Sequence, residues 1–207
     1  MSWPLAPGPC APGRHVLATE SLLLYTPRTQ LDAVAAIASG ADPEALRWLG
    51  LQTDRLFPDA DTRRAILRMN PLADPRRRIP RPLTQPFEPD PEDPEFLVCV
   101  LRDDGRYAGA LQLEQHKGHI GGWLAPGLRG QGLGAQLFGA GALLAHTHFG
   151  MDTVRAGAET GNLASRRSLE RAGFVPDEGP ARHTLPDGRE IDSVWLRHDV
   201  SPASYCH

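Results

Sequence analysis

The chain has no long apolar run. No stretch of its 207 residues approaches the ~20 consecutive apolar residues that a membrane-spanning helix needs. Its first residues also lack the basic start and apolar centre of a secretion signal. The net charge of −3 gives no excess of positive charge for binding nucleic acid or an anionic membrane. We therefore expect neither a membrane nor a nucleic-acid partner.

Cysteine is also scarce. The chain has three, Cys10, Cys99 and Cys206, and their spacing matches no metal site. A scattered, odd-numbered set is typical of reduced thiols, so we expect a cytoplasmic location. His146 and His148 are two residues apart and would point in different directions on a helix, with no third ligand nearby. We expect no metal cofactor.

The length suits one domain, and 41% hydrophobic with 23% charged residues is a globular balance. We predict a flexible tail over residues 1–14, a single domain over 15–200 and a second tail over 201–207. Within the domain, residues 70–94 contain eight prolines, too many for a helix or a central strand. Two interpretations of this segment stay open: an exposed loop, or a flap over the substrate.

Hydrophobic periodicity predicts alternating strands and helices elsewhere. The predicted helices cover residues 29–37, a segment beginning at the cap Asp42, 61–69 with Asp61 as its cap, 133–148, and a segment that Asn162 caps and Gly173 ends. The predicted strands cover residues 21–25, 96–101, 107–113, 119–124, 152–158, a segment from Phe174, and 193–197. This order indicates an α/β fold with a mixed, mostly antiparallel sheet flanked by helices. One strand–helix–strand crossover surrounds residues 128–134.

Residues 128–134 form a glycine-rich turn between an apolar strand and a helix. The first N–H groups of a helix have no intrahelical partner, and the helix dipole is positive there. Gly130, Gly132 and Gly134 have no Cβ, so a ligand can approach the backbone closely. Arg129 adds a cation that could pair with phosphate. We infer a site for a phosphate group, specifically a diphosphate.

Three phosphate-binding patterns compete for this turn. A P-loop would need a Gly-Lys-Ser/Thr ending, which is missing. A dinucleotide fingerprint is partly met by Gly130-x-Gly132-x-x-Ala135, but too few residues follow the turn for that fold. The pattern Arg/Gln-x-x-Gly-x-Gly/Ala is met by Arg129, Gly132 and Gly134. In this last pattern the turn resembles the acetyl-CoA pyrophosphate loop of the GNAT acyltransferases.

The resemblance continues on both sides of the turn. Residues 119–126 are similar to the strand that precedes the loop in the branch containing bacterial ribosomal-protein N-terminal acetyltransferases. Asn162-x-x-Ser165 ending in Gly173-Phe174 resembles the second signature of that branch. The resemblance implies the GNAT fold and an acetyl-CoA-dependent N-acetyltransferase. Its acceptor would be a primary amine, either a protein or peptide N-terminus or a small aminated metabolite. Such folds often pair, so a homodimer stays open.

Two alternatives stay open beside this reading. One is a non-catalytic acyl-CoA-binding module, because His119 stands where the branch often has Glu and Leu169 where many members have Tyr. The other is a protein that binds a nicotinamide dinucleotide.

The resemblance also implies which residues hold the cofactor. Backbone N–H groups near the end of the strand would hold the thioester and the pantetheine arm, the turn would hold the diphosphate, and the next helix would complete the site. These residues are Leu124, Ala125, Arg129, Gly130, Gln131, Gly132, Leu133, Gly134, Asn162 and Ser165.

Acetyl transfer requires the acceptor amine to lose a proton and the thiolate to gain one. A lysine amine has a pKa of ~10.4 and an α-amine ~8, so roughly 3 kcal/mol less is needed to deprotonate an N-terminus. The candidate bases are His119 and Glu159, with Glu114 and His116 as lesser options. The resemblance implies that Ser165 is the candidate proton donor to the thiolate. Helical spacing places it on one face with Leu169 and Ala172, toward the gap in the sheet.

Overall fold

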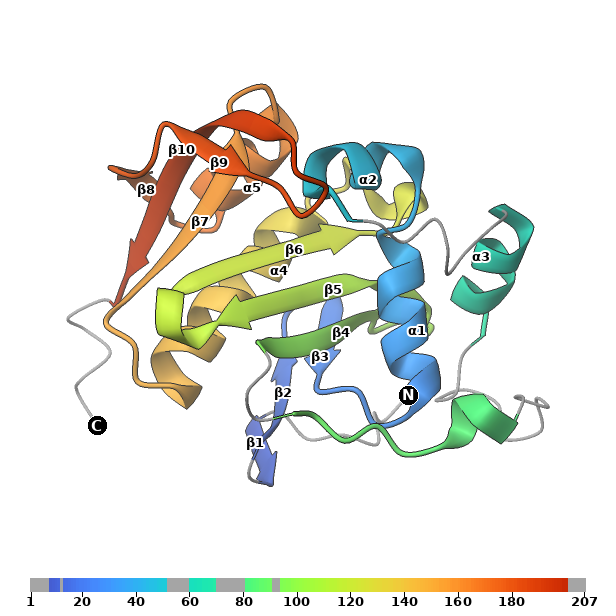
Figure 1. The fold of residues 1–207 in the computed structure, drawn as a ribbon. Helices are drawn as coiled ribbons and strands as arrows, with labels where there is room; N and C mark the ends of the chain where they lie inside the picture. Colours follow the sequence, from blue (N-terminus) through green and yellow to red (C-terminus); the bar gives the residue numbers. More distant parts are fainter. Residues whose placement is uncertain (1–7, 12, 52–59, 70–80, 91–93, 201–207) are drawn as a thin grey trace.

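The fold is a single mixed sheet with helices on both faces (Figure 1). The computed structural model describes residues 8–11, 13–51, 60–69, 81–90 and 94–200. Neighbouring strands follow the order β1-β2-β3-β4-β5-β6-β7-β10-β8, and β9 pairs with β10. The pair β6 and β7 is parallel and the other pairs are antiparallel, which confirms the predicted mixed, mostly antiparallel sheet.

The strands are β1 (Gly8–Ala11), β2 (Arg14–Ala18), β3 (Leu22–Tyr25), β4 (Glu95–Leu101), β5 (Tyr107–Glu114), β6 (His119–Leu124), β7 (Thr153–Glu159), β8 (Val175–Asp177), β9 (Arg182–Thr184) and β10 (Glu190–Asp199). The α-helices are α1 (Gln30–Ser39), α2 (Pro43–Leu49), α3 (Ala60–Leu67), α4 (Leu133–Leu143) and α5 (Leu163–Arg171). Short 3₁₀ turns are η1 (Arg81–Thr84), η2 (Gln115–Lys117) and η3 (Pro126–Leu128), and a π-helical turn, η4 (Leu144–His148), ends α4. None of the helices in the described ranges is long and apolar enough to cross a membrane.

Side-chain caps fix where the helices begin. Asp42 caps α2 by accepting from the N–H groups of Glu44 and Ala45, as the sequence predicts. Thr29 and Asp32 form a capping box that starts α1. The predicted cap of α3 is wrong, because this helix begins at Ala60 and Asp61 lies in its first turn. There the Asp61 carboxylate pairs with Arg64 and faces the positive end of the helix dipole.

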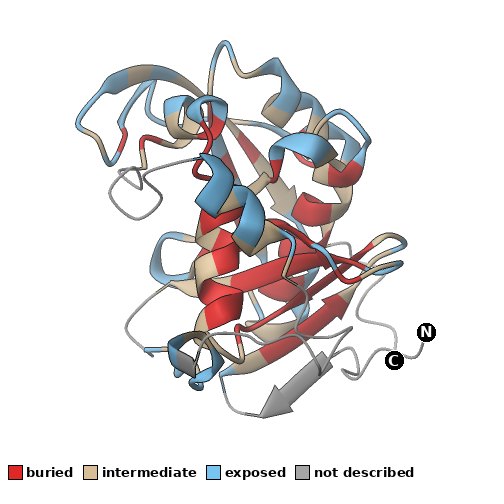
Figure 2. Cartoon of the chain, turned by 90° about the vertical axis from the view of Figure 1, so that its right-hand side faces the viewer, coloured by how far each residue is buried: buried red, intermediate tan, exposed pale blue. Residues whose placement is uncertain are grey.

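Two hydrophobic layers cover the two faces of the sheet (Figure 2). On one face, α4 buries the predicted stripe of Leu133, Leu137, Ala140 and Leu144. On the other, α1 packs over β4 and β5, and the Trp123 indole donates to the Ala36 carbonyl at 3.1 Å. The two faces of β6 are therefore different, because alternate residues point to opposite layers.

The N-terminal segment differs from the predicted tail. Residues 8–11 form the edge strand β1, which pairs with β2. The chain reverses at Gly13, whose φ of 69° is in the left-handed region that glycine adopts at little cost. Residues 1–7 and 201–207 lie outside the described residues.

Part of the proline-rich segment lies against the sheet and α1. Residues 81–90 form η1 and then an extended stretch, while residues 70–80 and 91–93 lie outside the described ranges. The Phe87 N–H donates to the Arg28 carbonyl at 3.0 Å. The Arg14 guanidinium donates to the carbonyls of Phe87 at 2.7 Å and Pro27 at 2.6 Å. This stretch is thus fastened to the α1 side of the sheet.

The π-helical turn at the end of α4 carries two histidine pairs. His148 Nδ1 lies 2.8 Å from His15 Nδ1 on β2, and His146 Nε2 lies 3.0 Å from His198 Nδ1 on β10. Each shared hydrogen bond needs one neutral ring, since a protonated imidazole has no acceptor. Burial lowers the pKa of His15, His148 and His198 below 6.5. The neighbouring His148 lowers the pKa of His15 further, and the pKa is lowered even though the Glu95 carboxylate lies 3.9 Å from His15 Nε2.

The free energy of unfolding should therefore fall on acidification. Above pH ~7.5 the three rings are neutral in both states, because an unperturbed histidine has a pKa of ~6.5. As the pH falls from ~7.5 to ~5, the unfolded chain takes up protons before the folded chain does, so stability is lost. Urea unfolding across this range should show the loss, and His148→Gln should reduce its slope. His116→Gln, in the exposed turn η2, is the control. An unchanged slope in His148→Gln would contradict the assignment.

Candidate active site

Strands β6 and β7 separate soon after they meet. They share one parallel register pair, His119 with Arg155, and the Arg155 N–H donates to the Gly118 carbonyl at 2.7 Å. Beyond this point β6 stays paired with β5, and β7 stays paired with β10 (Figure 1). An opening, referred to below as the β6–β7 opening, therefore widens toward Leu124 on one strand and Glu159 on the other.

The edge of β6 presents backbone donors to this opening. The Ala125 N–H donates to the Ala108 carbonyl of β5 at 2.8 Å. Successive N–H groups along a strand point alternately to its two neighbours. The N–H groups of Gly122 and Leu124 therefore point away from β5, toward β7. Leu124 is the donor that the sequence predicts. Ala125 is also predicted to bind the cofactor. Its N–H donates to the Ala108 carbonyl and its own carbonyl accepts from the Leu128 N–H, so both of its backbone groups are bonded within the chain.

The glycine-rich turn lies between the end of β6 and the start of α4. Gly130 and Gly132 have φ values of 77° and 81°, and a Cβ added to either would meet no heavy atom within 4 Å. Gly132 is the N-cap of α4, so the following N–H groups, beginning at Leu133, face this open side. Gln131 donates its amide to the Gly127 carbonyl at 2.9 Å and so closes the turn on itself. The turn has the features of an anion site.

Gly134 has a different role from the other two glycines. A Cβ at this position would lie 2.5 Å from Ser168 Oγ on α5. Its missing side chain therefore lets α4 and α5 pack closely, and it does not leave space for a ligand. Sequence alone could not separate these roles, because both require a residue without a Cβ.

Arg129 is bonded within the chain on several sides. Its Nε donates to the Leu124 carbonyl at 2.9 Å, Nη1 donates to Asp42 and Glu44 at 2.9 Å each, and Nη2 donates to Asp42 at 2.5 Å. These bonds occupy four of the five guanidinium N–H groups. Arg129 thus ties the end of β6 to the N-cap of α2, and a phosphate could take only the remaining donor without displacing a partner.

The first turn of α5 provides the other predicted cofactor residues. The Asn162 side chain caps the helix by accepting from the Ser165 N–H at 3.1 Å. Ser165 is half-buried and lies one turn before Leu169, which is fully buried in the core beside α4. Ser165 therefore lies on the inward side of α5, as the predicted helix face requires.

The candidate bases lie at opposite ends of the β6–β7 opening. His119 is at the narrow end, with its ring centroid 4.8 Å from that of Trp195. Burial lowers its pKa, which outweighs the nearby Glu114 carboxylate. Glu159 is four residues beyond the register partner of His119, roughly 13 Å farther along β7. The two side chains therefore cannot serve the same acceptor nitrogen.

Glu159 lies level with the predicted thioester donor. Glu159 and Trp123 are each four residues beyond the pair Arg155 and His119, so Glu159 and Leu124 lie at similar distances from the narrow end, on opposite edges of the opening. Glu159 is half-buried, and its Oε2 is fully shielded without a hydrogen-bond partner among the described residues. A buried carboxylate oxygen without a donor is costly, so this atom is suited to accept a hydrogen bond from a ligand.

Sequence reasoning missed two residues that shape this site. Asp42 was predicted only as a helix cap, yet it also holds Arg129. Trp195 covers Gly157 of β7, where an added Cβ would lie 3.2 Å from the indole ring. Both contacts join segments far apart in the chain, and no local pattern signals them. In the described part of the chain, no group of three or more His, Cys, Asp or Glu is placed to hold a metal ion.

Comparison with known proteins identifies the family of the chain. The family model described as an acetyltransferase (GNAT) domain matches residues 21–175. No curated protein sequence matches the chain.

Solved structures share the fold at low sequence identity. A GCN5-related N-acetyltransferase from Brucella melitensis aligns with a TM-score of 0.61 and 18% identity, covering 95% of this chain and 83% of that one. The ribosomal L7/L12 alpha-N-protein acetyltransferase RimL, solved with coenzyme A, aligns at 0.57 and 15%, covering 90% and 98%. An aminoglycoside acetyltransferase, also solved with coenzyme A, aligns at 0.54 and 17%, covering 86% and 95%.

Asp42→Asn should loosen the connection between the turn and α2. Asparagine still caps a helix, so the change mainly removes the charge that faces Arg129. We expect the free energy of unfolding to fall by roughly 1–3 kcal/mol, as for a lost hydrogen bond to a charged group. Urea denaturation tests this, with Glu44→Gln as the control because Glu44 is more exposed and contributes one bond. Equal losses of unfolding free energy in the two variants would show that the Asp42 contact with Arg129 contributes no more than the Glu44 contact.

Proposed function

Because the chain belongs to the acetyltransferase (GNAT) family, we propose that it transfers an acetyl group from acetyl-CoA to a primary amine. The observation that carries the proposal is the β6–β7 opening beside the glycine-rich turn. The opening offers backbone N–H donors for a thioester, and the glycine-rich turn offers a helix N-terminus for a diphosphate. Acetyl-CoA contains both groups, and the structures of RimL and the aminoglycoside acetyltransferase contain coenzyme A.

In the proposed complex, the diphosphate lies on the N–H groups that follow Gly132 at the start of α4. The carbonyl oxygen of the thioester accepts from the Leu124 N–H, which stabilises the charge it gains during attack. Arg129 acts mainly by holding this end of β6 in place, through its bond to the Leu124 carbonyl. Asn162 orders the first turn of α5 and so places Ser165 near the sulfur.

The amine nitrogen attacks the carbonyl carbon directly. The new C–N bond forms, the C–S bond breaks, and the amine loses one proton while the CoA thiolate gains one. We assign the base to Glu159, because it lies level with Leu124 and its Oε2 lacks a donor in the described residues. His119, at the narrow end of the opening, is the alternative base. Ser165 is the proposed proton donor to the thiolate.

The acceptor is proposed only by chemical class. It is a primary amine, on either a protein or peptide N-terminus or a small aminated metabolite. The names of two structural neighbours, an alpha-N-protein acetyltransferase and an aminoglycoside acetyltransferase, include one acceptor of each kind. A non-catalytic acyl-CoA-binding module is the alternative function, and turnover separates it from an enzyme.

The first experiment is calorimetric titration with acetyl-CoA, followed by thiol release with a panel of peptides and small amines. Gly132→Val should weaken acetyl-CoA binding at least ten-fold, because a β-branched residue is strained at a φ of 81° and fills the open side of the turn. Gly139→Val is the control, since a Cβ at Gly139 also meets nothing within 4 Å. Thermal unfolding should confirm that both variants fold. Unchanged affinity in Gly132→Val would refute the phosphate site.

Glu159→Gln should lower kcat by roughly 10²–10⁴-fold, the usual contribution of a general base. The amide keeps the size of the side chain but accepts a proton far less readily, so affinity for acetyl-CoA should hardly change. Steady-state thiol release tests this, with Glu190→Gln, an exposed residue at the start of β10, as the control. A normal rate in Glu159→Gln, together with a loss in His119→Gln, would move the base to His119.

A further inference from the structure

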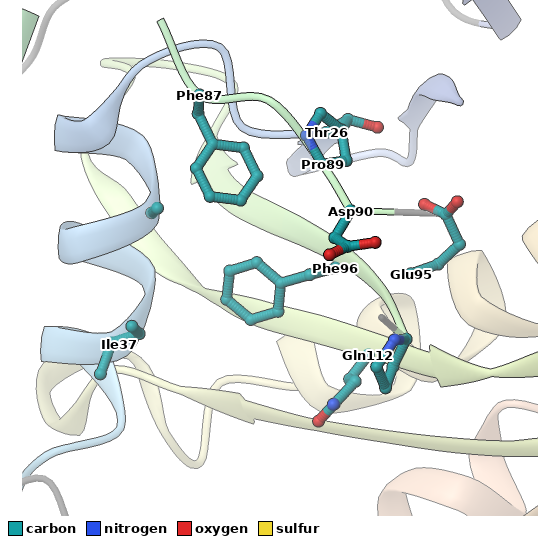
Figure 3. A pocket seen from close by; sticks show the side chains of 10 residues that line it. Thr26, Ile37, Phe87, Pro89, Asp90, Glu95, Phe96 and Gln112 are labelled. Carbon is teal, nitrogen blue, oxygen red and sulfur yellow. The ribbon is translucent and has the colours of Figure 1, made fainter. Parts of the chain in front are cut away.

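Two cavities lie apart from the glycine-rich turn. The larger, of about 330 Å³, lies between α1, the sheet and the described part of the proline-rich segment, and Figure 3 shows Phe87, Phe96 and Ile37 in its mostly apolar lining. The smaller, of about 230 Å³, lies at the narrow end of the β6–β7 opening and has a charged lining. The charges of the smaller cavity indicate the class of ligand that it can bind.

Three cations and one carboxylate line the smaller cavity. The lining consists of Lys117 and Gly118 ahead of β6, Thr153 and Arg155 of β7, Asp177 of β8, and Arg197 of β10. Two further carboxylates, those of Glu114 and Asp199, pair with Lys117 and Arg197 but do not belong to the lining. The cavity itself therefore has an excess of positive charge.

The two arginines share one face of the sheet. Arg155 and Arg197 are directly opposite each other in the ladder between β7 and β10. Their neighbours Val154 and Leu196 are buried in the core beneath α4, so the two guanidinium groups lie on the other face. Like charges at opposed positions destabilise a sheet. The Asp177 carboxylate relieves this, since it accepts from Arg155 Nε at 2.7 Å and lies 3.7 Å from Arg197 Nε.

These ion pairs orient the cations and leave most of their donors free. A guanidinium has five N–H groups and an ammonium has three. Arg155 uses its Nε on Asp177, and Arg197 uses Nη1 on Asp199 at 2.8 Å. Both Nη groups of Arg155 and the Nη2 of Arg197 have no partner among the described residues. Several donors from two strands are thus available to one ligand.

The positive charge of the cavity extends to His119, the register partner of Arg155. Burial is the largest cause of the lowered pKa of His119. The Glu114 carboxylate acts against it, while Lys117, Arg155 and His183 lower the pKa further. An anion in the cavity would offset the first two of these cations, so the pKa of His119 reports on its occupancy.

We propose that this cavity is an anion-binding site for a phosphate or carboxylate group. The planar guanidinium groups match the oxygens of such a group, and Lys117 adds a third positive charge. The site is separate from the glycine-rich turn, because the six residues of β6, roughly 20 Å, lie between the two. The inference does not depend on acetyl transfer.

Titration with inorganic phosphate tests the site. The ionic strength is held constant with sodium chloride, because exposed charges are screened by salt. NMR of the histidine rings follows His119, whose signal is assigned with His119→Gln. We expect a saturable shift of this signal and a raised pKa of His119 in the presence of phosphate. No saturable response, or the same response to chloride alone, would overturn the proposal.

Variants connect phosphate binding to the cavity. Arg155→Gln and Arg197→Gln should each weaken it roughly ten-fold, as for the loss of a hydrogen bond between charged groups. Arg182→Gln is the matched control, because this exposed arginine of β9 also faces carboxylates but does not line the cavity. Unchanged affinity in both cavity variants would overturn the proposal. Thermal unfolding checks that each variant folds, and using two covers the case in which one does not.

Acetyl transfer then distinguishes two sources of the anionic group, a free anion and the acceptor. Arg155 and Glu159 share one face of β7 and are roughly 13 Å apart, which an extended peptide spans in about four residues. The matched acceptors are the peptide amides Ser-Ala-Ala-Ala-Asp and Ser-Ala-Ala-Ala-Asn. A higher kcat/KM for the acidic peptide, lost in Arg155→Gln, would assign the group to the acceptor. Phosphate binding without this preference would assign a free anion. If no amine is acetylated, the phosphate titration still decides whether the site exists.

Discussion

The site depends on one constraint: β6 and β7 are neighbours in the sheet but share a single register pair. Each strand is held firmly on its other side, β6 by β5 and β7 by β10. Neither strand can turn toward the other without breaking an established ladder. The opening is therefore fixed by the sheet, and the N–H groups on the inner edge of β6 are directed to it before any ligand arrives.

Arg129 extends this constraint beyond the sheet. A partly buried guanidinium is stable only when most of its donors are satisfied, and here the partners are the Leu124 carbonyl and two carboxylates of the α2 N-terminus. The same contacts fix the end of β6, the entry to the glycine-rich turn and the position of α2. In the proposed mechanism, the arginine of the signature thus acts as a support for the donors and leaves the phosphate to backbone N–H groups.

In our proposal, the two faces of the sheet have different functions. The glycine-rich turn and α5 lie on the α4 face, where the diphosphate and the sulfur would be placed. Trp195, beside His119, and a pocket that Phe87, Phe96 and Ile37 of α1 line belong to the other face. Since side chains alternate along a strand, β6 can serve both faces, with backbone groups at the opening between them.

The sequence by itself determined the local features of this protein. Alternating hydrophobicity, helix caps and the glycine spacing depend on residues near one another in the chain, so they predicted most elements, the mixed sheet and the family. It could not give the roles of Gly134 or Asp42, the single register pair of β6 and β7, or the cavity beside the proline-rich segment. Each of these results from contacts between residues tens of positions apart, which are set only when the whole chain packs.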